Sequence, residues 1–327
     1  MKAFITGITG FVGGHLTEHL LAAGDETLGS STQGGWPARH ADWRCPPSSA
    51  RDRVEVLRWD LGDRAGLAEQ DRARIADFQP DCIYHLAALS VPSHCGADAP
   101  TERALAVNVD GTQRVLELAA SLPRRPRVLF ASSSHVYAPA AEAGAPLNEA
   151  AACRPRRGYG MSKLLAEQRI EVAMRDQRLD VVVARAFQHT GPRQEPEMML
   201  PEWAEQVVRE GEEPIRVRSL NTWIDLTDVR DVVRAYRLLV ARADAGGIYN
   251  VGSGAPRRTG DIFKRMIQLA KSARSAQELG SGGEKWDPIA DIDRLSTCTG
   301  WRPEMPLEQT IADTLAYWRQ RASGGLL

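Results

Sequence analysis

A tyrosine and a lysine four residues apart, Tyr159 and Lys163, are the side chains of this sequence best suited to proton transfer. They bound the segment Tyr-Gly-Met-Ser-Lys, which we expect at the start of a helix. Residues four apart lie on one face of a helix, so the phenol and the ammonium group would be neighbours. Because a nearby cation lowers the pKa of a tyrosine, Tyr159 is a candidate general acid or base near neutral pH.

Three consecutive serines, Ser132 to Ser134, follow an apolar run that we predict to be a strand. A hydroxyl at the end of that strand is placed to orient a substrate carbonyl or alcohol beside Tyr159. The Tyr-x-x-x-Lys spacing alone has little specificity, and it gains weight from this hydroxyl.

A glycine-rich turn follows the first apolar segment, with Gly7, Gly10 and Gly13 before apolar residues at helical spacing. The N–H groups and the dipole of such a helix start attract phosphate. Gly7 permits the tight turn, Gly10 lets the backbone approach a pyrophosphate, and Gly13 lets the helix pack on the sheet. The spacing differs from the shorter Gly-x-Gly-x-x-Gly fingerprint, so a turn that binds nothing stays open at this point.

The elements that must position these residues alternate between strands and helices. Strands are predicted at 2–6, 26–29, Val54–Trp59, Cys82–Leu86, Val128–Ala131 and Val181–Ala184, and helices at 11–23, Arg64–Ala76, Thr101–Ala120 and Ser162–Gln177. This alternation predicts an α/β protein with a Rossmann-type, doubly wound parallel sheet that binds ligands at its carboxyl edge. Residues 31–52, with Trp36 and Trp43, are expected to form a partly ordered cover.

The alternation weakens after Phe187. Further helices are predicted at Leu200–Gly211, Val229–Arg242, Gly260–Ala270 and Leu307–Arg321. We therefore expect residues 1–186 to form a dinucleotide-binding domain to which 222–252 returns, and residues 187–327 to form a smaller substrate-binding lobe.

The composition excludes several kinds of partner. The 41 basic and 42 acidic residues are interspersed, which leaves no electrostatic footprint for nucleic acid or a membrane surface. Five scattered cysteines suggest neither a disulfide framework nor a zinc site, so we expect no metal and a reducing compartment. With no leader and no apolar run near the ~20 residues that span a bilayer, we expect a cytoplasmic protein.

A set of motifs in fixed order resembles the extended short-chain dehydrogenases/reductases that modify nucleotide sugars, and the likeness runs from end to end. The matching stretches are Thr6-Gly-Ile-Thr-Gly-Phe-Val-Gly13, Asp60-Leu61, His85-Leu-Ala-Ala88, Asn108-Val-Asp-Gly-Thr112, Ser132-Ser-Ser-His-Val-Tyr137, Tyr159-x-x-x-Lys163 and Asp225-Leu-Thr-Asp-Val-Arg-Asp231.

The resemblance implies a role for each matching residue. Tyr159 would be the catalytic acid or base, Lys163 would hold the nicotinamide ribose and lower the tyrosine pKa, and Ser133 would hydrogen-bond the reacting oxygen. His85 is either a core histidine or part of the cofactor pocket. The expected cofactor-binding residues are Gly7, Gly10, Phe11, Val12, Gly13, Ser30, Asp60, Leu61, Leu86, Ala87, Ala88 and Asn108, together with Tyr159 and Lys163.

The residues after Ser133 restrict the reactions that are possible within the family. Family members that eliminate water carry a glutamate here, whereas this chain has Ser134 and His135, which argues against a 4,6-dehydratase. Residues 184–192 resemble a stretch of the GDP-mannose group in which an asparagine, here Gln188, faces the sugar nucleotide. The pattern is closest to GDP-4-keto-6-deoxy-D-mannose reductases. Ser134, His135 and Gln188 are thus the expected substrate contacts, with His135 either a second acid/base or a pocket wall.

Two positions depart from the family pattern. Ile224 and Ser281 stand where relatives carry arginines that clamp the substrate diphosphate. Either another arginine substitutes, or the substrate is not an ordinary nucleotide diphosphate sugar. The candidates are Arg193, Arg216, Arg218, Arg257 and Arg258.

The cofactor form follows from the end of the second strand, Gly29-Ser30-Ser31-Thr32. Relatives that prefer NAD place a carboxylate there. Its absence favours NADP, with Ser30, Ser31 or Arg39 as phosphate contacts, and leaves NAD possible.

Hydride transfer to a 4-keto-6-deoxy sugar nucleotide is therefore the favoured function. The alternatives are an epimerase with tightly bound NAD, a dehydrogenase of a non-nucleotide substrate, and a non-catalytic dinucleotide-binding relative. By resemblance we also expect a homodimer through helices 101–120 and 162–178, although their apolar residues Leu105, Val109, Leu116, Leu164 and Ile170 would serve equally as core.

Overall fold

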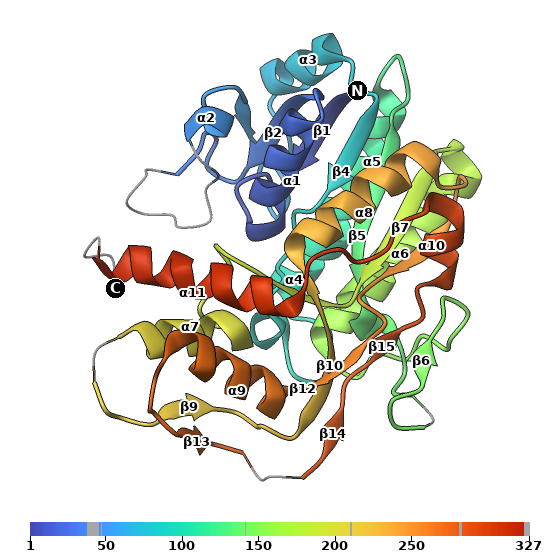
Figure 1. Cartoon of the computed structure of the whole chain (residues 1–327). Coiled ribbons are helices and arrows are strands. Elements are labelled where there is room, and N and C mark those ends of the chain that lie inside the picture. The colour runs from blue at the N-terminus through green and yellow to red at the C-terminus, as the bar shows by residue number, and fades with distance from the viewer. Residues whose placement is uncertain (38–45, 47, 141, 210, 281–282, 324–327) are drawn as a thin grey trace.

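A parallel sheet of seven strands organises the computed structural model, which describes residues 1–37, 46, 48–140, 142–209, 211–280 and 283–323 (Figure 1). The strand order is β11-β7-β5-β4-β1-β2-β3, and all neighbours are parallel. This confirms the predicted Rossmann-type sheet. The strands are β1 (Lys2–Thr6), β2 (Glu26–Ser31), β3 (Val56–Arg58), β4 (Cys82–His85), β5 (Arg127–Ser133), β7 (Val181–Ala186) and β11 (Ile248–Val251).

Helices cover both faces of the sheet because its strands are apolar on both sides. One face carries α1 (Phe11–Ala22), α8 (Val229–Arg242) and α10 (Asp293–Thr299), whose apolar residues share one core cluster with the strands. The other face carries α3 (Glu69–Phe78), α5 (Gly111–Ser121) and α6 (Gly158–Gln177), which close a second core. Leu116 and Ile170 belong to that second core.

Several predicted helix boundaries move in the structure, and the helix predicted at Leu200–Gly211 is observed at Met199–Val208. The helix predicted from Arg64 begins at Glu69, because Gly66 adopts a left-handed conformation with φ 73°. The helix predicted from Ser162 begins at Gly158, which brings Tyr159 into its first turn. The segment predicted as one helix at 101–120 divides into α4 (Glu102–Ala104), a π-helical turn η2 (Leu105–Asp110) and α5.

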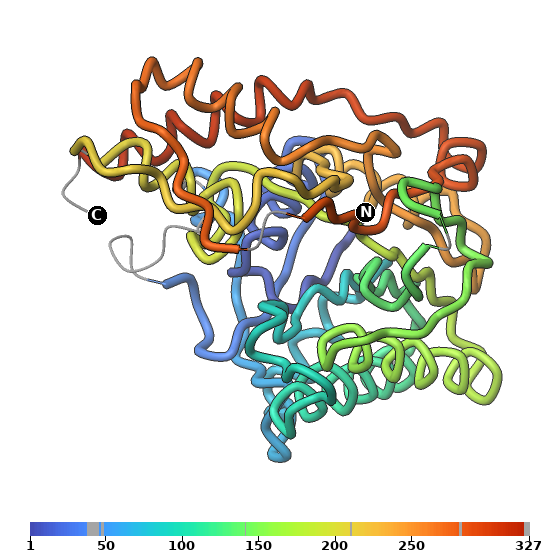
Figure 2. Tube along the Cα trace, turned by 90° about the horizontal axis from the view of Figure 1, so that it is seen from below, coloured from blue at the N-terminus to red at the C-terminus, as the bar shows by residue number. Residues whose placement is uncertain are grey.

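A smaller lobe lies below the sheet in Figure 1 and in the upper part of the view in Figure 2; its chain is yellow to red, colours that α8 and α10 on the sheet share. Its helices α7 (Met199–Val208), α9 (Thr259–Ala270) and α11 (Leu307–Ser323) pack with β9 and β10 around a third core. The strands are β8 (Gln188–Thr190), β9 (Ile215–Val217), β10 (Thr222–Asp228), β12 (Pro256–Arg258), β13 (Ala276–Glu278) and β14 (Lys285–Trp286). β10 pairs with β8, β12 and β14, so 222–228 lies with the lobe, whereas α8 and β11 return to the main sheet.

Short elements complete the chain. They are α2 (Ser48–Arg51), η1 (Pro92–Cys95), η3 (Ser134–Val136), β6 (Pro146–Leu147) and β15 (Ile289–Ala290). Trp36 packs against the α1-side core, and its indole donates to the Val54 carbonyl at 3.3 Å. Arg39, Trp43 and Cys45 lie outside the described residues.

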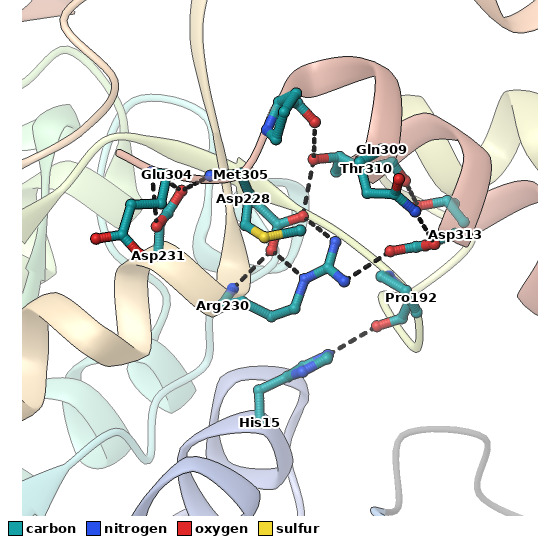
Figure 3. A network of polar contacts seen from close by, with 12 residues as sticks. His15, Pro192, Asp228, Arg230, Asp231, Glu304, Met305, Gln309, Thr310 and Asp313 are labelled. Atoms are coloured by element: carbon teal, nitrogen blue, oxygen red, sulfur yellow. Dashed lines mark hydrogen bonds and ion pairs between the residues drawn. The ribbon is translucent and has the colours of Figure 1, made fainter. Parts of the chain in front are cut away.

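The acidic motif at 225–231 joins the lobe to the sheet (Figure 3). Asp228 caps α8 through the Arg230 N–H at 2.7 Å and accepts from the Thr310 hydroxyl of α11 at 2.8 Å. The Arg230 guanidinium bridges Asp228 and Asp313, and Asp231 accepts from two backbone N–H groups just before α11. Because each of these carboxylates holds the lobe against the sheet, the motif has a structural role rather than a catalytic one.

Three further observations concern the described residues alone. No helix there is both long and apolar enough to cross a membrane. No three His, Cys, Asp or Glu side chains gather as a metal ion requires. Cys82, Cys95, Cys153 and Cys298 are free thiols.

Candidate active site

A cavity of about 2250 Å³ lies between the glycine turn, the carboxyl ends of the central strands and the lobe. It brings together residues that are far apart in the sequence. Of the predicted site residues, those that line it are Gly7, Gly10, Phe11, Val12, Gly13, Asp60, Leu61, Leu86, Ala87, Ala88, Ser133, Ser134, His135, Tyr159, Lys163 and Gln188. Ser30 and Asn108 are buried behind the wall.

The glycine turn has the conformation that phosphate binding requires. Gly7 is left-handed with φ 71°, and a Cβ there would lie 2.8 Å from the Ala87 Cα. A Cβ at Gly13 would meet the Gly7 carbonyl oxygen at 2.4 Å, so that glycine packs on the turn itself. Gly10 precedes α1 and offers no side chain to cap its first N–H groups, and the residues from Gly10 to Gly13 line the cavity. The turn therefore fits the pyrophosphate of a dinucleotide.

Two glycines fix Tyr159 between two loops. A Cβ at Gly158 would lie 2.2 Å from the Cys95 carbonyl oxygen, and one at Gly160 would lie 2.1 Å from that of His135. The start of α6 can approach both backbones only because these positions lack side chains. Neither glycine was predicted as a site residue, although the pattern Gly-Tyr-Gly in the sequence indicates a close backbone approach on both sides of Tyr159.

The pKa of Tyr159 differs from the expectation, and the pKa of Lys163 is shifted as well. Burial raises the pKa of Tyr159 to about 12, and a hydrogen bond with Ser133 acts in the opposite direction with smaller effect. Burial also lowers the pKa of Lys163 to about 8. The predicted lowering of the tyrosine pKa is thus wrong for this structure, because desolvation dominates and the Lys163 ammonium donates to the Ala131 carbonyl at 2.8 Å. Tyr159 is therefore protonated at neutral pH, the form a general acid needs.

The three serines have separate environments. The Ser132 hydroxyl donates to Glu167 at 2.5 Å, within a buried ion pair between Glu167 and Arg185 at 2.7 Å. Ser133 lines the cavity beside Tyr159, and its hydroxyl oxygen accepts from the His135 N–H at 3.2 Å. Ser133 is thus the one of the three placed to act with Tyr159.

His135 lies against the candidate general acid. Its ring and that of Tyr159 meet edge to face with centroids 5.5 Å apart. Burial lowers the pKa of His135, so its imidazole is neutral near neutral pH. It lines the cavity, where a neutral ring can accept or donate one hydrogen bond to a ligand.

His85 and Asn108 are buried beneath the cavity wall and fix neighbouring elements through hydrogen bonds. His85 bridges the hydroxyls of Thr6 and Thr112 at 2.8 and 3.0 Å, and burial lowers its pKa to about 3, so it is a core histidine. Asn108 accepts from the Leu89 N–H at 2.8 Å and donates to the Ser162 hydroxyl at 2.9 Å. It stands in the π-helical turn and ties the loop after β4 to α6.

The part of the cavity wall that the lobe supplies combines polar and apolar residues. Gln188 donates to Asp287 at 2.8 Å, and Lys285 pairs with the same carboxylate at 3.2 Å. Ile224, only 2% exposed, belongs to the lobe core at the cavity wall. Ser281 lies outside the described residues.

The structure separates the five candidate arginines. Arg193 is buried in an ion pair with Glu18 at 2.5 Å and contacts His15, away from the cavity. Arg258 donates to Asn221 at 3.0 Å and, like Arg257, does not line the cavity. Arg216 and Arg218 do line it.

The cavity wall also includes Ser31, the last residue of β2, and Thr32 directly after it. The register of β2 and β3 places Arg58 opposite Ser31, and its side chain is exposed. This basic residue was missed in the sequence, because only strand pairing brings it to Ser31.

Comparison with known proteins gives concordant matches. Residues 3–252 match the model of the NAD dependent epimerase/dehydratase family. The GDP-6-deoxy-D-mannose reductase of Pseudomonas aeruginosa is 28% identical over 98% of both chains.

Solved structures cover the same length. RMD from Pseudomonas aeruginosa complexed with NADPH superposes with a TM-score of 0.79, 27% identity and coverage of 98% of this chain and 99% of that one. A putative epimerase from Burkholderia cenocepacia gives a TM-score of 0.82 with 30% identity and 98% coverage of both chains.

Proposed function

We propose that this chain, which belongs to the NAD dependent epimerase/dehydratase family, reduces the 4-keto group of a nucleotide-linked 6-deoxyhexose with NADPH. The chain is an enzyme of the extended short-chain dehydrogenase/reductase family, and proteins similar to it include nucleotide-sugar reductases, epimerases and dehydratases. The proposal specifies one of these reactions.

The side chains around Ser133 in the cavity wall are the observation that supports this proposal most directly. A protonated Tyr159 stands beside the Ser133 hydroxyl, so the wall offers a proton to a reacting oxygen. Ser134 and His135 occupy the positions at which a dehydratase needs its glutamate. Donors without that carboxylate suit carbonyl reduction better than elimination of water.

The roles of the residues follow from their chemistry. A bound NADPH would supply the hydride that reaches the carbonyl carbon. The Ser133 hydroxyl donates a hydrogen bond to the carbonyl oxygen, and Tyr159 gives that oxygen its proton. Lys163, with a pKa of about 8, is largely charged at neutral pH and is the residue that would hold the nicotinamide ribose.

The cofactor form rests on the end of β2. Ser30 and Ser31 offer no carboxylate to repel a 2′-phosphate, and Arg58 stands in register with Ser31. We assign the phosphate to Ser31, Thr32 and Arg58, with Ser30 supporting the turn through its carbonyl, which accepts from Gly7 N–H at 3.0 Å. Asp60 and Leu61 line the adenine side.

The same proposal includes the domain organisation, the cellular location and the oligomeric state of the enzyme. Residues 1–186, with α8 and β11, form the dinucleotide-binding part, and the substrate lobe is built from 187–327 outside these two elements, with 222–228 included in it. The enzyme works in the cytoplasm in GDP-mannose metabolism as a homodimer. Support for the dimer comes from Leu165 and Val172, which are 39% and 46% exposed on α6.

The test is a kinetic assay with GDP-4-keto-6-deoxy-D-mannose as substrate. We expect loss of NADPH absorbance, formation of the 4-hydroxy sugar nucleotide, and weaker use of NADH. An epimerase would instead retain NAD(H) through purification, which mass spectrometry of the denatured protein detects, and would interconvert two sugars without consuming cofactor. That result, or no turnover of any sugar nucleotide, would refute the proposal.

A further inference from the structure

Two arginines line the cavity from the end of strand β9, Arg216 within the strand and Arg218 directly after it. Ile215 and Val217 point into the lobe core, where both are fully buried. Because side chains alternate along a strand, Arg216 and Arg218 lie on the opposite face, and both line the cavity. Their Cα atoms are two residues apart, about 6.6 Å along the strand, so both side chains can reach one anionic group.

The backbone beneath these arginines is firmly held. The Gln206 side chain accepts from the Arg216 N–H at 2.8 Å and donates to the Arg216 carbonyl at 3.0 Å. On the other side, β13 pairs with β9, and the Gly280 N–H donates to the Arg218 carbonyl at 3.0 Å. The strand therefore offers a fixed platform.

The two guanidinium groups are themselves unengaged. Within the part of the chain that the structure describes, neither makes a hydrogen bond or ion pair through its side chain, and both residues are exposed. Arginines without an internal partner that face a cavity are available for a ligand.

The local charge favours an anion. Glu202 is the carboxylate that the two arginines influence, and burial raises its pKa. The nearby Glu205 is already paired with Arg209 at 2.7 Å. The two guanidinium groups thus act on the Glu202 carboxylate, while its neighbour Glu205 is neutralised by Arg209.

We propose that Arg216 and Arg218 bind the diphosphate of the substrate, and so replace the clamp that Ile224 cannot provide. A guanidinium offers two parallel donors to phosphate oxygens, a geometry that isoleucine lacks and lysine only partly supplies. This inference rests on the proposed function, since it requires a substrate with a nucleoside diphosphate. It assigns substrate affinity to β9 and leaves the hydride-transfer step to Ser133, Tyr159 and Lys163.

The experiment measures binding of GDP, UDP and dTDP by isothermal titration calorimetry, with NADPH as the internal reference. Arg216→Ala and Arg218→Ala should each weaken binding of the preferred diphosphate at least about tenfold, as expected when charge-assisted hydrogen bonds are lost. NADPH affinity should not change, which also shows that the variants are folded. Arg302→Ala, an exposed arginine of the same lobe outside the cavity, is the matched control.

The outcomes separate the inference from the proposed function. If a nucleoside diphosphate binds the wild type and both variants equally, the assignment to β9 is wrong and the proposed function stands. If NADPH binds but no nucleoside diphosphate binds at millimolar concentration, both fail. Arg218→Lys should recover only part of the affinity, and full recovery would show that a point charge suffices and that the guanidinium geometry is not used.

Discussion

Replacing Lys163 by methionine should make the protein more stable while it abolishes activity. Lys163 is buried, and its pKa falls from 10.5 to about 8 on folding. Each pKa unit corresponds to about 1.4 kcal/mol, so holding the charged lysine in the folded protein costs about 3 kcal/mol at pH 7. Loss of the hydrogen bond to the Ala131 carbonyl offsets about 1 kcal/mol. The expected net gain is about 2 kcal/mol in the free energy of unfolding.

The pH dependence identifies the cause. Between pH 8 and 10.5 the unfolded chain keeps the Lys163 proton while the folded protein has released it. The unfolded state then binds more protons, so this group makes the wild type more stable as the pH rises. Lys163→Met lacks that contribution, and its advantage should shrink steadily across this window.

Urea denaturation followed by tryptophan fluorescence, at several pH values from 7 to 10, measures both effects. Lys264→Met, at an exposed position of α9, is the control and should change stability by less than about 0.5 kcal/mol. The reasoning is refuted if Lys163→Met is less stable than the wild type at pH 7. It is equally refuted if the difference between them stays constant up to pH 10.

Three further substitutions test other parts of the site. Tyr159→Phe should lower kcat by about 10²- to 10⁴-fold, because the proton donor is lost and the packing is kept; a smaller loss argues for another acid. Gly160→Ala should destabilise the protein by about 1–3 kcal/mol and reduce turnover, because its Cβ would meet the His135 carbonyl oxygen at 2.1 Å. Thermal unfolding detects the first effect, and an unchanged melting temperature would contradict it. Arg58→Ala should weaken NADPH about tenfold and leave NADH unaffected in fluorescence titrations; equal losses would remove Arg58 from the phosphate site.

Apolar periodicity and capping residues were sufficient to predict the bounds of elements whose ends depend on their own sequence. Helix α8 has the predicted bounds, Val229 to Arg242, because an apolar stripe follows the capping residue Asp228. The parallel sheet follows from alternating apolar runs and helices. The glycine turn could also be predicted from the sequence, because its left-handed conformation at residue 7 favours glycine.

Properties that depend on three-dimensional surroundings were not readable. The spacing of Tyr159 and Lys163 predicts a cation near the phenol, but the degree of burial that raises the tyrosine pKa is set by several elements at once. Arg193 and Arg216 look alike in the sequence. Only the fold shows that Arg193 is buried against Glu18 and that Arg216 faces the cavity.

The central claim, that this enzyme reduces a sugar carbonyl, is tested most directly by stoichiometry. GDP-4-keto-6-deoxy-D-mannose is supplied in limiting amount with excess NADPH, and the NADPH oxidised is compared with the sugar nucleotide converted. The account predicts one NADPH for each sugar nucleotide reduced, with Tyr159→Phe nearly inactive. Conversion of the sugar nucleotide without any oxidation of NADPH would contradict it and would identify the reaction as epimerisation.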